Sequence, residues 1–349
     1  MSSLPLLPDC ESKPKLLGIA RLAAEGESLR EGHNVEYLTL ESRSLLNRVV
    51  SRRELPFTWA INPYRGCEFA CKYCYARYTH EFIFPTKPNP GLAGRPELRD
   101  GVDFERKIFV KQHAAELLRH ELKKVKRGEE IAIGTATDPY QPAERRYEIT
   151  RAILEELARH AGLHLGIVTK SNLVLRDAEI LRRVAANNRL FVNVTVTTVD
   201  AELARKLEPR APRPDLRLEA VRQLNLAGVD AGVICAPVLP EITDHPRDLE
   251  KLVKAARDAG AKYVFANPLF LKPCSAAVFL PFLEEQFPSL VEIYRARYRD
   301  RAFLPKGYGE RLTRLMAALR KKHCIGSQHA RISQRAYPAL SGEQMALFG

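Results

Sequence analysis

The chain has 349 residues, of which 45% are hydrophobic and 28% are charged, a balance typical of a globular protein with a large core. No apolar run approaches the ~18 residues needed to span a bilayer, which excludes a membrane-spanning protein and leads us to expect a cytoplasmic one. Lysine and arginine outnumber aspartate and glutamate by 55 to 42, and the formal charge of +13 favours a polyanionic partner such as nucleic acid over a merely solvated basic surface.

Residues 1–55 form an N-terminal extension that we expect to be partly flexible. Its segment "SRSLLNRVVSRREL" (42–55) mixes charged and apolar residues and predicts one amphipathic helix. Residues 56–300 carry the regular pattern of a folded core, and residues 301–349 are polar and irregular enough to be interpreted as a C-terminal tail.

The core alternates apolar stretches rich in β-branched residues with segments of helical spacing. Each apolar stretch predicts a buried strand. The six predicted strands cover residues 57–64, 131–137, 164–170, 190–198, 230–238 and 262–269. The six predicted helices cover residues 74–84, 112–126, 143–160, 174–188, 215–228 and 246–260, and a further helical stretch covers 279–298. Such alternation indicates an α/β fold with parallel strands, either a (β/α) barrel or part of one, or a doubly wound sheet.

Three of the seven cysteines lie within eight positions, in "GCEFACKYCYAR" (66–77), directly after the first predicted strand. Cys71 and Cys74 are spaced to share one face of the helix that we expect to open there, and Cys67 lies on its approach loop. Three thiolates suit an iron–sulfur cluster with one open iron. Zinc would need a fourth ligand, for which His80 is the nearest histidine, and three buried structural thiols are the remaining alternative.

The C-x3-C-x2-C spacing at the end of strand one in a six-fold β/α chain resembles the radical S-adenosylmethionine (radical SAM) superfamily. Within it the chain looks most like the spore photoproduct lyase and DNA repair photolyase-like branch. The resemblance is carried by "CKYCYAR", "GTATDPYQPAER" (134–145), "VTKSNL" (168–173) and the segment 208–244. It implies a partial (β/α)6 TIM-like barrel of the radical SAM type.

The resemblance also implies the cofactors. Cys67, Cys71 and Cys74 would hold a [4Fe–4S] cluster, with SAM on the fourth iron. One electron, from a donor such as a flavodoxin or ferredoxin, would cleave SAM to a 5′-deoxyadenosyl radical. The implied SAM-contacting residues are Tyr73, Thr135, Thr137, Asp138, Lys170, Thr195 and Thr197.

One position departs from the branch. Spore photoproduct lyases use a cysteine near the end of strand two as hydrogen-atom donor, and this chain has Thr135 there, whose O–H bond is too strong to replace a thiol. Tyr75 matches a tyrosine that the branch uses in radical relay. Cys235 and Cys274 lie at or beyond later strands and are candidate donors, although Cys235 is flanked by apolar residues typical of a buried core.

The last residues contain a separate motif. "QMALF", Gln344 to Phe348, resembles the pentapeptide by which bacterial proteins bind the sliding clamp, and it follows a stretch expected to be flexible. The alternative is an amphipathic end that folds back onto the core.

Together these features predict a radical SAM enzyme, lyase-like, that binds DNA or another nucleic acid and acts in a repair-like reaction. Two alternatives stay open: a radical SAM enzyme that modifies a peptide or small molecule, and a non-enzymatic metal-binding nucleic-acid module. The first would show no DNA affinity, and the second would bind metal without cleaving SAM.

Overall fold

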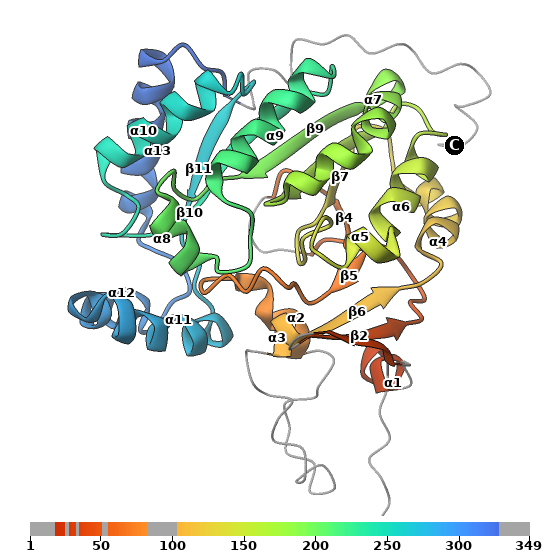
Figure 1. Cartoon of the computed structure of the whole chain (residues 1–349), viewed down its shortest axis with the longest axis horizontal. Coiled ribbons are helices and arrows are strands. Elements are labelled where there is room, and N and C mark those ends of the chain that lie inside the picture. Colours follow the sequence, from red (N-terminus) through yellow and green to blue (C-terminus); the bar gives the residue numbers. More distant parts are fainter. Residues whose placement is uncertain (1–17, 25–27, 33–34, 51–54, 82–102, 328–349) are drawn as a thin grey trace, which may run out of the picture.

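The computed structural model describes residues 18–24, 28–32, 35–50, 55–81 and 103–327, and Figure 1 shows their arrangement. The predicted clamp-binding peptide 344–348 lies outside the described residues. No helix in the described ranges is long and apolar enough to cross a membrane.

A seven-stranded sheet forms the centre of the described structure. Its spatial order is β11-β10-β9-β8-β7-β4-β3. The first six strands in this order are parallel to one another, and β3 pairs antiparallel with β4 at the edge. The strands are β3 (Leu46–Arg48), β4 (Trp59–Ile61), β7 (Glu130–Ile133), β8 (His164–Thr169), β9 (Arg189–Thr195), β10 (Ala231–Val238) and β11 (Val264–Pro268). The six parallel strands fall within or next to the six predicted segments, and they follow one another in space as in the chain. A doubly wound sheet would reverse direction at a switch point, so the partial barrel is confirmed.

Helices cover the outer face of this sheet (Figure 1). Alternate strand residues such as Ile131, Ile133, Leu165 and Ile167 are buried against them, because successive side chains of a strand point to opposite faces. The covering helices are α4 (Ala114–Glu121), α6 (Ile149–Leu157), α7 (Ala178–Asn187), α9 (Pro214–Leu226), α10 (Pro246–Asp258) and α13 (Lys306–Lys322).

Helix α13 lies in the region that the sequence assigned to the tail. Leu312, Met316 and Leu319 are buried at helical spacing in the core between the sheet and the helices, and α13 packs against β11 and α10. It covers the last strand as the other helices cover theirs. Its many basic residues concealed this spacing.

A smaller four-stranded sheet lies beside the barrel, in the order β1-β2-β6-β5. Its strands are β1 (Ser28–Gly32), β2 (Val35–Leu40), β6 (Lys107–Lys111) and β5 (Tyr64–Arg65). The sequence predicted none of β1, β2 and β6. The helix predicted over 42–55 is wrong where it is described: residues 46–48 form β3, because they pair with β4 and because Glu121 accepts the backbone N–H groups of Leu45 and Leu46 at 2.9 and 2.8 Å.

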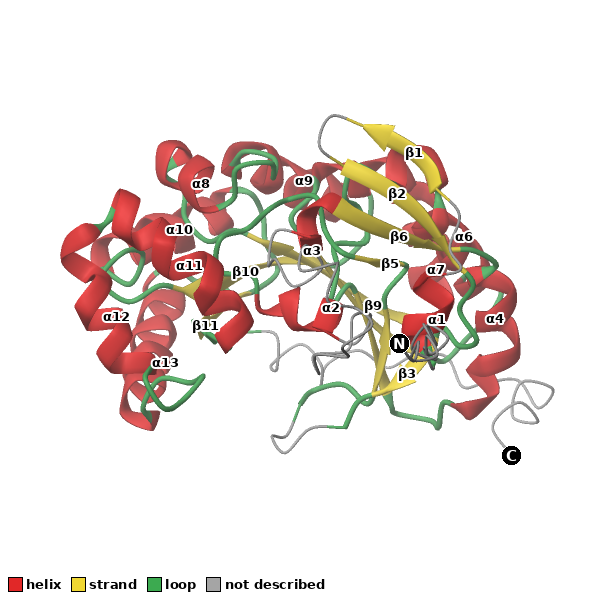
Figure 2. Cartoon of the chain, turned by 90° about the horizontal axis from the view of Figure 1, so that it is seen from below, coloured by secondary structure: helices red, strands yellow, loops and turns green. Residues whose placement is uncertain are grey.

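Two helices near the cysteine loop build a second core. Phe279 and Leu283 of α11 (Pro273–Gln286) and Tyr294 of α12 (Val291–Tyr298) pack in one cluster with Phe69 and Tyr73. Figure 2 shows these two helices at one end of the molecule. The remaining helical elements are α1 (Ile19–Ala24), η1 (Tyr75–Arg77), α2 (Tyr78–Glu81), α3 (Asp103–Arg106), η4 (Leu122–Lys124), α5 (Glu144–Tyr147), η5 (Asn172–Asp177), α8 (Ala201–Leu207) and η6 (Pro288–Leu290).

Candidate active site

The C-terminal ends of the parallel strands bring the predicted residues together. The cysteine loop, residues 66–74, follows β4 and β5, and Thr135, Lys170 and Thr197 follow β7, β8 and β9 in turn. A hydrogen bond of 3.0 Å joins Tyr73 of the loop to Thr197, 124 positions away in the chain. Active sites of β/α barrels lie at this edge.

The cysteine loop begins at Gly66, whose φ of +85° is a backbone conformation that favours glycine. A Cβ here would lie 2.6 Å from the carbonyl oxygen of Lys107. The Gly66 carbonyl accepts hydrogen bonds from the Thr137 hydroxyl at 2.5 Å and from the Gln141 amide at 3.2 Å. Close backbone approach and side-chain bonds from β7's end therefore fix where the loop starts.

The rest of the cysteine loop is hydrogen-bonded to three distant parts of the chain and to the neighbouring Arg77. The bonds are Cys67 N–H to the Phe104 carbonyl (2.9 Å), Lys72 N–H to the Leu207 carbonyl (2.9 Å), Ser275 Oγ to the Cys74 carbonyl (2.9 Å) and Arg77 Nη2 to the Cys71 carbonyl (3.0 Å). These hydrogen bonds to the surrounding protein fix the backbone of the loop in one conformation.

The shared helical face predicted for Cys71 and Cys74 is wrong. Ala70 has a left-handed φ of +55° and Cys74 an extended backbone, so η1 begins only at Tyr75. The three cysteines are brought near one another by the loop instead.

The thiols lie in largely apolar surroundings. Cys71 is buried, Cys67 and Cys74 are partly buried, and all three pack against a cluster that includes Phe69 and Tyr73. Burial raises the pKa of Cys67 well above its ordinary value and that of Cys71 to about 12, although the nearby Lys170 charge opposes the second shift. Such thiols stay neutral until a metal centre takes up their thiolate form.

No three His, Cys, Asp or Glu side chains in the described ranges are close enough to hold a single metal ion. A [4Fe–4S] cluster is held differently, because each thiolate binds a separate iron. Three cysteines on one loop fit that donor set. His80, the candidate fourth ligand for zinc, packs edge-on against Phe104 and Phe109 and contacts the Lys107 carbonyl at 3.3 Å, and burial lowers its pKa to about 4.

A buried carboxylate, Glu208, is the centre of the network opposite the thiols. It accepts hydrogen bonds from Tyr73 and, at 2.8 Å, from Thr197. Arg217 Nη2 lies 2.5 Å and Lys170 Nζ 3.9 Å from its oxygens, and the Glu208 and Arg217 side chains are each 1% exposed. Burial alone would raise the pKa of Glu208, but the charges of Arg217 and Lys170 outweigh it and hold that pKa below its usual range.

This network contains two cations for one carboxylate. Arg217 is taken up by Glu208 and by the carbonyls of Pro212 and Thr195, at 2.6 and 3.2 Å. Lys170 is more open: its side chain is 17% exposed, and its Nζ lies 5.8 Å from the centre of the Tyr73 ring. Lys170 is therefore the more accessible of the two cations, and its pairing with a ligand carboxylate stays a prediction.

Thr137 and Asp138 support the site through hydrogen bonds to other protein groups. The Asp138 carboxylate accepts the Tyr140 N–H (2.9 Å), the Thr169 hydroxyl (2.7 Å) and the Lys170 N–H (2.7 Å), which fixes the end of β8. Both predicted residues are buried and already bonded to protein. Direct cofactor contact from Thr137 or Asp138 stays a prediction.

Thr135 and Tyr75 meet at the mouth of the site. The Tyr75 hydroxyl donates to the Thr135 carbonyl, and Asn62 Nδ2 lies 3.4 Å from the Thr135 hydroxyl. Tyr75 is 41% exposed and Thr135 is partly exposed. Both residues are more exposed than the buried groups around Glu208.

The other two candidate donors lie in different places. Cys235 is fully buried with Val233 in the core between the sheet and the helices, on the strand face opposite Thr195, and its Sγ contacts the Thr197 carbonyl at 3.8 Å. Cys274 is partly buried in the first turn of α11, next to Ser275, which holds the cysteine loop. Their roles, like those of Thr195 and Thr197, stay predictions.

Sequence reasoning missed Glu208 and Arg217. One signal was present: Arg217 has the spacing of the buried residues Ala220, Val221 and Leu224 on α9, where a charge needs a partner. That partner, Glu208, opens the segment 208–244 that carries the resemblance, but nothing in its place after a helix marked it as a site residue.

The family model described as "Radical SAM superfamily" matches residues 61–264, more than half of the chain. An uncharacterised protein of Mycobacterium tuberculosis (strain ATCC 25618 / H37Rv) is 36% identical over 307 residues, which cover 88% of this chain and 86% of that relative. An uncharacterised protein of Methanocaldococcus jannaschii is 28% identical over 235 residues, 67% of this chain and 78% of that one.

Among solved structures, a spore photoproduct lyase variant with bound AdoMet and dinucleoside spore photoproduct has the same fold. Its TM-score is 0.60 at 14% identity, with 83% of this chain and 80% of that chain covered. A second variant of that lyase gives a TM-score of 0.61 at 14% identity, with 90% and 85% covered.

Proposed function

The chain belongs to the radical SAM superfamily, and we propose that it is a SAM-cleaving enzyme that acts on nucleic acid in a repair-like reaction. Enzymes of this superfamily use a [4Fe–4S] cluster and SAM, which together supply a 5′-deoxyadenosyl radical when bound. The observation that carries the proposal is the meeting of three thiols with Lys170 and the Glu208 network at the C-terminal edge of the barrel.

Each group of the site has a part in this proposal. Cys67, Cys71 and Cys74 would hold the cluster, and Lys170 would pair with the carboxylate of SAM. Tyr73 lies between them, with its hydroxyl fixed by Thr197 and Glu208. Thr135, Thr137, Asp138, Thr195 and Thr197 remain the candidate contacts to the other polar groups of SAM.

The second core shields the cysteine loop from solvent. Phe279, Leu283 and Tyr294 of α11 and α12 are buried in one cluster with Phe69, Cys71 and Tyr73 of the loop. This apolar packing would exclude water from that side of the loop, which radical chemistry requires.

Tyr75 is the proposed hydrogen donor to the substrate radical. Its phenol lies at the carbonyl of Thr135, the position where the lyase branch has its donor cysteine. Transfer of the O–H hydrogen to a substrate carbon leaves a tyrosyl radical, which one electron from a flavodoxin- or ferredoxin-type donor and one proton from solvent restore. Cys274, beside the loop, is the second candidate.

A nucleic-acid substrate is supported by the chain's charge and by the fold. The excess of 13 positive charges favours a polyanion, and the solved lyase of the same fold holds a dinucleoside. The terminal Gln344–Phe348 peptide would bring the enzyme to DNA if it binds the sliding clamp.

Anaerobic reconstitution tests the chemistry. We expect iron and sulfide in a 4:4 ratio per chain, and 5′-deoxyadenosine when dithionite and SAM are added. Cys74→Ala should abolish both, whereas Cys324→Ala, which removes an exposed cysteine at the end of α13, should change neither. Full SAM cleavage by the Cys74→Ala protein would refute the proposal.

The substrate is tested by incubating the reconstituted enzyme, SAM and reductant with damaged or intact DNA, followed by mass analysis of the nucleosides. With deuterated DNA as the substrate, transfer of deuterium from the DNA into 5′-deoxyadenosine would support the assignment. Deuterium from a labelled peptide pool, with none from DNA, would instead establish the peptide-modifying alternative. Tyr75→Phe should still cleave SAM but release less nucleoside product.

A further inference from the structure

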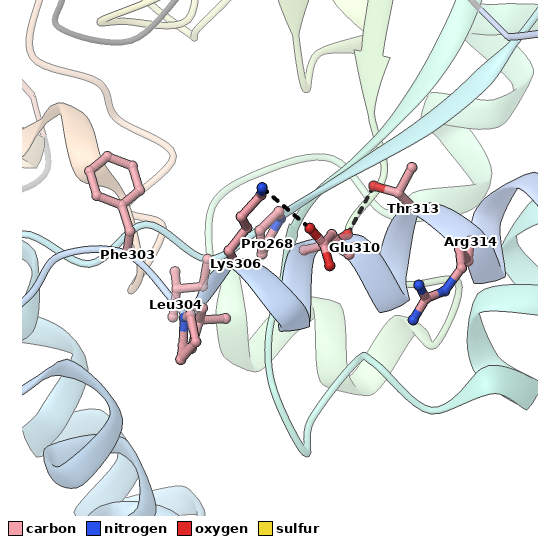
Figure 3. Close-up of a pocket in the computed structure, with 10 residues that line it drawn as sticks. Pro268, Phe303, Leu304, Lys306, Glu310, Thr313 and Arg314 are labelled. Carbon is pink, nitrogen blue, oxygen red and sulfur yellow. Dashed lines mark hydrogen bonds and ion pairs between the residues drawn. The ribbon is translucent and has the colours of Figure 1, made fainter.

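We propose that a pocket between the end of β11 and helix α13 binds an unpaired stretch of nucleic acid beside the active site, an inference that rests on the proposed function. The pocket has a volume of about 640 Å³, within the range of small-ligand sites, and can hold a base with its sugar. Figure 3 shows Phe303 at one end, Arg314 at the other, and Lys306 and Glu310 of α13 between them.

A row of aromatic rings joins this pocket to the active site. The Phe303 ring stacks on Phe270 with 4.2 Å between centroids and 21° between planes, and Phe270 lies 6.1 Å from Tyr75. Tyr75 reaches Thr135 through its hydroxyl. A strand bound at Phe303 would therefore continue directly to the proposed hydrogen donor.

Two cations line the pocket itself, Lys306 and Arg314. The surrounding segment, residues 295–322, contains ten Lys and Arg against two acidic residues, and Arg295, Arg297 and Lys322 among them pair with acidic side chains outside it. Glu310 is the one acidic residue of α13, and it lies 3.6 Å from Lys306, which is 93% exposed. Arg314 is exposed one further turn along the helix.

Rings and cations in this combination fit an unpaired strand better than a duplex. Bases stack on aromatic side chains with their flat faces, which a duplex keeps covered, while basic side chains follow the phosphates. A further cation, Lys272, lies beside the aromatic rings. Its Nζ is 3.5 Å from the centre of the Tyr78 ring and 5.8 Å from that of the Phe270 ring. An acidic peptide could pair with the cations but has no flat bases to stack on the aromatic rings.

Fluorescence anisotropy of a labelled 20-nucleotide DNA strand and of its duplex, titrated with the reconstituted full chain at several salt concentrations, tests the proposal without SAM or reductant. We expect tighter binding of the single strand. Phe303→Ala should weaken binding of the single strand about five-fold or more, since each base–ring stack contributes ~1–3 kcal/mol. Phe303→Tyr, which keeps the ring, should bind the strand as the wild type does. Lys306→Ala/Arg314→Ala should reduce the slope of log K against log salt by about 1.4, or ~0.7 for each lost phosphate contact.

The matched control is Arg182→Ala/Arg183→Ala, which removes two exposed charges from α7 and should leave binding unchanged. Iron content and thermal unfolding verify that each variant is folded, and the Lys306 and Arg314 side chains can be removed without touching the core. Failure of the wild type to bind either DNA form, equal losses in the control, or an unaffected Phe303→Ala protein would each overturn the proposal. Failure of the proposed function is separate, because it shows as absent deoxyadenosine or unaltered nucleosides.

Discussion

Replacing Glu208 by Gln should destabilise the protein strongly. The change keeps the size of the side chain but removes its charge, and the guanidinium of Arg217, 1% exposed and 2.5 Å from Glu208, then has no carboxylate. Leaving one partner of a buried ion pair uncompensated costs ~3–5 kcal/mol. With an unfolding entropy of ~2.1 cal/mol/K per residue, a chain of 349 residues should melt about 4–7 °C lower.

The assay is thermal and denaturant unfolding of the wild type, Glu208→Gln, Arg217→Met and the double variant. If the loss comes from the unpaired buried charge, the double variant should be more stable than Glu208→Gln alone, because it buries no unpaired cation. Glu179→Gln provides a matched control: it removes one side of an exposed pair with Arg182 and should cause no measurable change.

The pH dependence follows from the same geometry. The pKa of Glu208 lies below its ordinary value of 4.5 in the folded chain, so its contribution is complete above about pH 4.5 and is lost as the pH falls through the folded pKa. Glu208→Gln should lack this part of the acid transition. Melting of the variant within error of the wild type at neutral pH, or a difference between them that does not shrink in acid, would refute the reasoning.

Three further outcomes are expected. Gly66→Ala, which adds a Cβ 2.6 Å from a carbonyl oxygen at φ +85°, should lower iron per chain after reconstitution and cost at least ~1–2 kcal/mol of stability; full loading would contradict the tight approach. His80 has its pKa lowered to about 4 by burial, so stability should fall by ~3 kcal/mol as the pH drops from 6.5 to about 4, and His80→Gln should remove that slope in denaturant titrations. Lys170→Met should weaken SAM binding, measured by calorimetry on the reconstituted protein, about ten-fold or more; unchanged affinity would remove Lys170 from the site.

The barrel was predictable because its signals are local. Each parallel strand is an apolar run, and each covering helix up to α10 has its own periodicity, so neither depends on knowing the partner. The cysteine spacing is local as well. The strands β1 and β2 gave no such signal, since "SLREG" and "VEYLTL" are short and half polar and become strands by pairing with each other and with β6.

The Glu208 network shows which part of the site could not be predicted from the sequence. Tyr73 and Glu208 are 135 positions apart, and their contact depends on how the loop after α8 meets the cysteine loop. Lys170 could be placed because it directly follows a predicted strand. Glu208 follows a helix, where polar residues are common and no position is preferred for function.

The many attachments of the cysteine loop also mean that its surroundings come from most of the chain. Its hydrogen-bond partners extend from Tyr37, which donates to Glu68, through Leu207 to Ser275, which donates to the Cys74 carbonyl. A chain that ended before α11 would lack the bond from Ser275 and the packing of Phe279 and Leu283 beside the loop.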